Sequence, residues 1–135
     1  MSPKRSPFDR DALVKAARTA QKQAYAPYSK YKVGAALLTT NGAIFTGCNV
    51  ENASYPAGIC AERVAVTKAI SEGQHKFVAI AIVTKNGGSP CGICRQVMSE
   101  FAPDLQLVLA NGSRVVHEFT MDELLPERFG PDKLK

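Results

Sequence analysis

Residues 77–83 read FVAIAIV, an apolar run rich in β-branched side chains. A strand with one face in water would alternate apolar and polar residues, whereas a strand covered on both faces does not. We therefore predict that this run is a central strand of a sheet. No apolar run in the chain reaches the ~20 residues that a membrane-crossing helix requires, so no membrane segment is expected.

A helix is predicted on each side of this strand. Residues 60–72 have apolar residues at helical spacing, and Gly73 is a typical helix stop. Residues 91–101 form the second helix, which Ala102-Pro103 ends, and residues 85–90 form the turn before it. Helices that alternate with apolar strands indicate a layered sheet.

Two β-hairpins are predicted, one before and one after these elements in the chain. Residues 33–40 and 43–49 flank Asn41-Gly42, and residues 105–109 and 114–119 flank Asn111-Gly112. Asn-Gly favours a tight turn in which both central residues have positive φ. Residues 50–59 show no regular period and are expected to form a loop.

A helix is predicted at each end of the chain. The first begins with Ser6 as its cap and Pro7 as its first residue, and Pro27 ends it. Its apolar face comprises Phe8, Ala12, Leu13, Ala16, Ala17, Ala20 and Ala24. Thr120 and Glu123 form a capping box that opens a short helix through Leu125. The prediction is an α/β fold in three α-β-α layers, with five strands and helices on both faces, as a single domain over residues 1–135.

Composition and charge argue against some classes of function. The net charge is +5, but no five consecutive residues are basic and the chain has no Trp. A solvated surface therefore explains the charge better than polynucleotide binding does. The first seven residues hold charge and Pro rather than the apolar segment of a signal peptide, so we expect a cytoplasmic, reduced protein. There, four cysteines favour metal binding or catalysis over disulfides.

The distinctive residues are Cys60-Ala61-Glu62 and Pro90-Cys91-Gly92-Ile93-Cys94. The helix over residues 60–72 advances ~20 Å, and the strand after it runs back about as far. Cys91 therefore returns to the end of the sheet where Cys60 lies. The positive ends of both helices favour thiolates, the form of cysteine that binds zinc. Three thiolates leave zinc one position for water, which is typical of a catalytic site. We predict that Cys60, Cys91 and Cys94 bind Zn²⁺.

Glu62 and Arg63 follow the first cysteine. A carboxylate two residues after a ligand is placed to move protons to and from water, whereas alone it would only complement the helix dipole. We predict that Glu62 is the catalytic acid and base. Arg63 would donate a hydrogen bond to a ligand sulfur, and its alternative is an ordinary surface arginine.

These motifs resemble the small homotetrameric zinc-dependent cytidine deaminases of the cytidine and deoxycytidylate deaminase superfamily. Zinc ligand, any residue, Glu, then P-C-x-x-C is the signature of zinc deaminases. The resemblance also covers residues 25–31 (YAPYSKY), 33–37 (VGAAL), 47–52 (GCNVEN), 60–63 (CAER), 90–96 (PCGICRQ), 123–126 (ELLP) and 129–131 (FGP).

The resemblance implies a mixed sheet and hydrolytic deamination of cytidine and deoxycytidine to uridine and deoxyuridine in pyrimidine salvage. It implies one Zn²⁺ per subunit and a homotetramer with active sites shared between subunits. The reaction would occur at carbon 4, with Glu62 protonating the adjacent ring nitrogen and then the amino group, which leaves as ammonia.

The resemblance also assigns substrate contacts. Asn49 and Glu51 would bind the ribose hydroxyls, although either suits a strand-end turn. Tyr31 stands where the family usually has Phe and would pack on the pyrimidine. The Ala61 backbone and the Ser89 carbonyl would contact the base and its amino group. Two aromatic side chains are expected at a neighbouring subunit's site, those of Tyr55 and Phe129, and Phe129 alone could equally anchor the tail.

Two departures from the family pattern stand out. Ile93 occupies a position that usually holds Ala and is expected to face the core, and the turn over residues 85–89 is short. Three alternatives stay open. They are a deaminase of a related aminopyrimidine nucleoside such as blasticidin S, a polynucleotide editor, and a non-catalytic zinc module with Cys48 or a His as fourth ligand.

Overall fold

A five-stranded mixed sheet forms the centre of the molecule. The computed structural model describes residues 8–134. The strand order is β2-β1-β3-β4-β5, with β3 and β4 parallel and all other neighbours antiparallel. The strands are β1 (Gly34–Thr39), β2 (Ile44–Cys48), β3 (Phe77–Thr84), β4 (Gln106–Asn111) and β5 (Arg114–Thr120). The predicted apolar run is the middle strand, β3, and the mixed sheet is confirmed.

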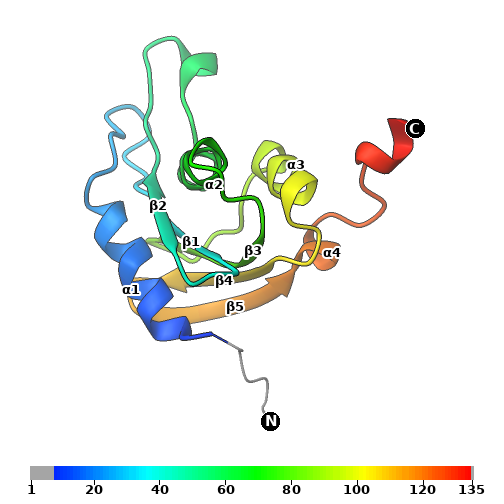
Figure 1. Cartoon of the computed structure of the whole chain (residues 1–135). Coiled ribbons are helices and arrows are strands. Elements are labelled where there is room, and N and C mark those ends of the chain that lie inside the picture. Colours follow the sequence, from blue (N-terminus) through cyan, green and yellow to red (C-terminus); the bar gives the residue numbers. More distant parts are fainter. Residues whose placement is uncertain (1–7, 135) are drawn as a thin grey trace.

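Helices cover both faces of this sheet (Figure 1). α1 (Arg10–Gln21) packs on one face, and α2 (Ala61–Ser71), α3 (Gly92–Phe101) and α4 (Met121–Leu124) pack on the other. Ile80 and Ile82 of β3 point toward α2 and α3, while Ala79 and Ala81 point toward α1. Burial on both faces explains why β3 contains no alternating polar residues. The three predicted layers are confirmed.

Two short 3-10 helices complete the chain. They are η1 (Tyr55–Ala57), inside the predicted loop 50–59, and η2 (Pro131–Leu134), which the sequence did not predict. Over residues 8–134, no helix has the length and apolar character that spanning a membrane requires.

The predicted ends of the first helix are wrong. The N-cap is Asp9, whose side chain accepts a hydrogen bond from the Ala12 backbone, and Ser6 and Pro7 lie outside the described residues. The helix ends at Gln21, well before Pro27, because the chain turns so that the Tyr25 backbone can pair with Asn49 and Glu51. Long-range pairing therefore overrides the local helical pattern. Ala12, which was assigned to the apolar face, is exposed.

Both hairpins are confirmed, but the predicted turn conformation is wrong. Gly42 and Gly112 have positive φ, at 92° and 61°, whereas the asparagines before them do not. Asn41 instead uses its side-chain oxygen, which accepts hydrogen bonds from the Thr39 hydroxyl and the Ala43 backbone. The side chain thus closes the turn without a left-handed asparagine.

Glycine lets a helix approach the sheet at Gly47. A Cβ atom there would lie 2.5 Å from the Ala61 carbonyl oxygen and 2.7 Å from the Ala65 nitrogen. Real Cβ contacts are never this short, so the first turn of α2 lies directly on the backbone of β2. This contact fixes the height of α2 above the sheet.

Candidate active site

The site forms at one edge of the sheet, because strand directions bring several chain segments there. Gly34, the first residue of β1, pairs with Cys48 at the end of β2 and with Val83 near the end of β3. The segments that follow β2 and β3 lead to the starts of α2 and α3. Cys60 is the N-cap of α2, and Cys91 is the N-cap of α3.

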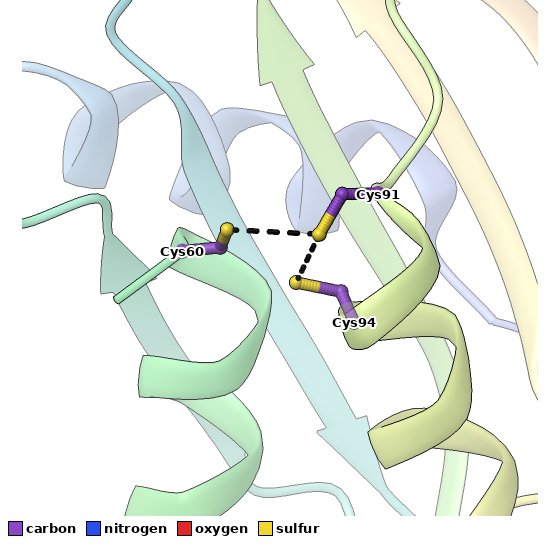
Figure 2. Close-up of side chains that lie close together, drawn as sticks. All are labelled: Cys60, Cys91 and Cys94. Atoms are coloured by element: carbon purple, nitrogen blue, oxygen red, sulfur yellow. Dashed lines mark hydrogen bonds between the residues drawn. The ribbon is translucent and has the colours of Figure 1, made fainter. Parts of the chain in front are cut away.

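The structure brings the three predicted metal-binding cysteines together (Figure 2). The sulfur of Cys91 lies 3.8 Å from that of Cys60 and 3.4 Å from that of Cys94. Zinc–sulfur bonds of ~2.3 Å in a tetrahedron place two ligand sulfurs about 3.8 Å apart. The spacing and the soft donor set therefore fit a zinc ion.

Four protein ligands would indicate a structural zinc site rather than a catalytic one. Among the described residues, these three cysteines form the only group of three or more His, Cys, Asp or Glu residues close enough to hold a metal. Neither Cys48 nor a histidine joins them. The non-catalytic module therefore has no fourth protein ligand in this structure.

Hydrogen bonds and charge favour a thiolate at Cys60. The hydrogen bond with the Cys94 thiol, together with Arg63 and against the effect of burial, lowers the pKa of Cys60 to about 5. The same contact with Cys60, together with burial, raises the pKa of Cys94. Arg63 donates from Nη2 to the Cys60 sulfur at 3.8 Å, and its Nε is buried without a hydrogen-bond partner in residues 8–134.

Glu62 lies in the first turn of α2, with only 4% of its surface exposed. A carboxylate that merely complements a helix dipole would be solvated, so burial beside three sulfurs needs another explanation. Burial, together with the negative charge of Cys60, raises the pKa of Glu62 to about 7. Its neighbour Ala61 is completely buried.

Asn49 and Glu51 hold the loop that precedes β1. The Asn49 side chain accepts from the Val33 nitrogen at 2.9 Å and donates to the Tyr31 carbonyl at 2.8 Å. Glu51 accepts from the Tyr28 and Ser29 nitrogens at 3.0 and 3.1 Å, and from the Ser29 hydroxyl. The bonds from Ser29 lower the pKa of Glu51.

An open pocket of about 380 Å³ lies beside this loop. It is lined by Tyr28, Ser29, Glu51, Asn52 and Tyr55. Of these, only Glu51 and Tyr55 were predicted to bind substrate. Tyr28 and Ser29 lie inside the string YAPYSKY and Asn52 inside GCNVEN, so the motifs contained the signal, but only the fold shows that these side chains share a pocket.

Ser89 lies in the segment between β3 and α3, and Tyr31 contacts this segment. The Tyr31 hydroxyl donates to Asn86 Oδ1 at 2.6 Å, and Lys85 Nζ lies 5.7 Å from the ring centroid. The Ser89 hydroxyl accepts from Arg95 Nη2 at 2.9 Å. The two predicted substrate contacts are thus held by Asn86 and Arg95, to which the sequence assigned no role.

Arg95 joins three segments around the start of α3. Its Nε donates to the Pro90 carbonyl at 2.8 Å, and its Nη1 donates to the Leu124 carbonyl at 2.8 Å. With the bond to Ser89, the guanidinium fixes the two residues that precede Cys91 against the end of α4. Its place in the string PCGICRQ was the only sequence signal for this function.

Phe129 lies away from the three cysteines along α3. It borders a crevice with Ser99 and Pro103 near the C-terminal end of this helix, and its carbonyl accepts from Gln96 Nε2 at 2.9 Å. Its side chain is 57% exposed. Ile93 is 63% exposed, so the prediction that it faces the core is wrong. Position 93 lies in the first turn of α3 on its outer side.

Comparison with known proteins identifies the family. Residues 8–110 match the family model for the cytidine and deoxycytidylate deaminase zinc-binding region. Cytidine deaminase from Halalkalibacterium halodurans is 50% identical over 90% of this chain and 95% of that protein. Cytidine deaminase from Sporosarcina psychrophila is 44% identical over 94% and 96%.

A solved structure agrees in fold. The crystal structure of cytidine deaminase from Burkholderia pseudomallei has a TM-score of 0.85 and 48% identity over 90% of this chain and 100% of that one. The folds match over nearly the whole of both chains, and the family model includes all three cysteines. The chain belongs to the cytidine and deoxycytidylate deaminase zinc-binding family.

Proposed function

We propose that this chain is a zinc-dependent cytidine deaminase that hydrolyses cytidine and deoxycytidine to uridine and deoxyuridine with release of ammonia. The observation that carries the proposal is the group of three sulfurs at two helix starts, with the buried carboxyl of Glu62 in the adjoining turn. The named relatives are cytidine deaminases, so the blasticidin S alternative has no comparable support.

Cys60, Cys91 and Cys94 would hold one Zn²⁺ per subunit. When bound, a zinc ion with three protein ligands supplies Lewis acidity that makes water a stronger acid. The hydrogen bond from Arg63 withdraws charge from the Cys60 sulfur and would thereby keep three thiolates from cancelling the charge of a bound ion.

Glu62 would move the protons. It takes a proton from the attacking water and delivers it to the ring nitrogen beside carbon 4, while the water oxygen bonds to that carbon. The remaining proton of that water then passes through Glu62 to the amino group, the carbon–nitrogen bond breaks, and ammonia leaves. Its burial excludes bulk water, which would otherwise exchange protons with the carboxyl.

The remaining predicted residues would bind the nucleoside. The Ala61 backbone and the Ser89 carbonyl would contact the base, and the Tyr31 ring would pack against it. Asn49 and Glu51 would bind the ribose, and the position of Glu51 in the open pocket supports this. Both already hold the loop before β1, so each would serve the sugar with its remaining hydrogen-bonding capacity.

The active form would be a homotetramer in which neighbouring subunits complete each site. Tyr55 and Phe129 are 75% and 57% exposed, and large exposed aromatic side chains are typical of interfaces. We assign the enzyme to the cytoplasm and to pyrimidine salvage, as one domain over residues 1–135 that acts on free nucleosides rather than nucleic acid.

The decisive experiment follows the absorbance of cytidine with the purified protein before zinc removal, after removal by a chelator, and after zinc is restored. We expect turnover, its loss and its return. Activity that persists without metal would contradict the proposal. Faster turnover of blasticidin S than of cytidine, or deamination of single-stranded DNA or RNA, would favour the corresponding alternative.

A further inference from the structure

Two chain segments meet beside the candidate active site, and a side-chain hydrogen bond joins them. Because β1 and β3 are antiparallel neighbours, the residues entering β1 lie next to those leaving β3. Tyr31 precedes β1, and Asn86 follows β3. Their contact therefore joins the segment held by Asn49 to the segment that leads to Cys91.

Asn86 is the centre of this contact. Its Oδ1 accepts hydrogen bonds from the Tyr31 hydroxyl at 2.6 Å, the Thr84 hydroxyl at 3.2 Å and the Gly88 nitrogen at 3.2 Å. An amide oxygen has two lone pairs, so three donors occupy it fully. Tyr31 makes the shortest of the three bonds, and its hydroxyl is the group that the family's usual Phe lacks.

The backbone after Asn86 is fitted closely between its neighbours. A Cβ on Gly88 would lie 2.8 Å from the Tyr31 hydroxyl oxygen. Gly87 has a φ of 71°, and a Cβ there would lie 2.9 Å from a methyl group of Val116 on β5. The short turn 85–89 therefore follows a single path, with the Tyr31 hydroxyl against one side and β5 against the other.

We propose that Asn86 is a positioning residue for the Tyr31 ring, and that this pair fixes the distance between the ring and the Ser89–Cys91 segment. The proposal rests on the proposed function, in which Tyr31 packs on the base and Ser89 contacts it. The Tyr at position 31 and the short turn over residues 85–89, both expected from the sequence to differ from the family pattern, are thus joined by one contact. In the proposed function the Tyr31 ring, and not its hydroxyl or Asn86, contacts the base, so the pair acts on substrate binding rather than on the chemical step.

The test compares Tyr31→Phe, Asn86→Ala and the double variant in steady-state kinetics on cytidine. We expect Tyr31→Phe, which loses one hydrogen bond, to raise KM about fivefold with kcat within about twofold. Asn86→Ala loses all three bonds to Oδ1 and should raise KM at least as much. The double variant should be no worse than Asn86→Ala alone, because the bond that Tyr31→Phe removes is already lost in that variant. Asn86→Asp keeps an acceptor oxygen and should restore KM toward that of the parent.

Asn41→Ala is the matched control. Asn41 also accepts two hydrogen bonds in a turn, but it lies at the opposite end of β1. This variant should leave KM unchanged. An equal rise of KM in Asn41→Ala would mean that any weakened turn has this effect, and would overturn the proposal.

Hydrogen exchange of the Gly88 amide gives a second readout that needs no activity. Tyr31→Phe removes a single oxygen and is the variant least able to prevent folding. It should speed exchange at Gly88, although Tyr31 does not bond to that amide, whereas Asn41→Ala should not. Parental KM and exchange rates in Tyr31→Phe, or additive effects in the double variant, would overturn the proposal. An inactive parent would refute the proposed function, while the exchange rates would still decide the role of Asn86.

Discussion

The four α-helices found over residues 8–134 begin in two different ways. α1 and α4 are capped by side chains: Asp9 accepts from the Ala12 nitrogen, and Thr120 and Glu123 form a capping box. α2 and α3 begin at Cys60 and Cys91, and neither cysteine makes a side-chain capping hydrogen bond. Removing a good N-cap typically costs ~0.5–2 kcal/mol.

The uncapped helices are the two that carry the candidate site. In these first turns the positive end of the helix dipole is directed at the cysteine sulfurs. A conventional capping side chain would occupy part of that helix end. Glu62 and Glu123 show the same contrast, since both lie in a first turn. Glu123 is exposed and bonds back to Thr120, whereas Glu62 is buried beside the thiols. α2 and α3 thus lack the stabilisation of a side-chain cap at the two helix starts that carry the candidate site.

The sharpest test of this contrast is Glu62→Gln. The variant keeps the shape of the side chain but cannot accept a proton, so turnover of cytidine should fall ~10²–10⁴-fold. Zinc content, measured by metal analysis, should stay at one per subunit. The matched change Glu123→Gln alters the other first-turn glutamate and should leave kcat within about twofold. Normal turnover by Glu62→Gln would refute its catalytic role.

Thr120→Ala tests the conventional cap. Loss of the capping box should lower the free energy of unfolding by about 1 kcal/mol, measured by denaturant titration. The specific activity of the folded protein should not change, because α4 begins away from the sulfurs. A loss of activity larger than the loss of folded protein would mean that α4 contributes to the site.

Cys60→Ser converts an uncapped helix into a capped one. Serine accepts a hydrogen bond from the first turn, so the metal-free variant should be more stable than the metal-free parent by about 0.5 kcal/mol. The same change removes a thiolate and should lower the zinc content well below one per subunit. Cys48→Ser is the control, since Cys48 lies in β2 and caps no helix. A metal-free Cys60→Ser protein that is less stable than its parent would contradict the comparison.

The sheet was predictable to the extent that local patterns determine it. The apolar run 77–83 identified the central strand, and the two Asn-Gly pairs identified both hairpins. The C-terminal end of α1 was not predictable, because the pairing of Tyr25 with Asn49 joins residues distant in sequence. The turn conformation at Asn41 was missed for a related reason, since its own side chain replaced the expected backbone geometry.

The residues of the candidate site likewise include some that local patterns predict and some that they do not. Cys60, Cys91 and Cys94 could be grouped from sequence, because helix and strand lengths return the chain to one edge. The roles of Asn86 and Arg95 could not be inferred, since their partners are backbone and side-chain atoms that only the folded chain brings near. The sequence predicted roles that follow from the lengths of helices and strands. It did not predict roles that follow from a single contact between distant residues.

The close approach at Gly47 has a consequence for anyone who redesigns this protein. The residue has no reactive atom and meets no ligand, yet even one added methyl group would collide with the backbone of α2 beside Cys60 and Glu62. A library that randomises every position should therefore recover glycine at 47 as strictly as cysteine at 60. Transplanting the three thiols onto another sheet would likewise require this bare stretch of strand beneath them.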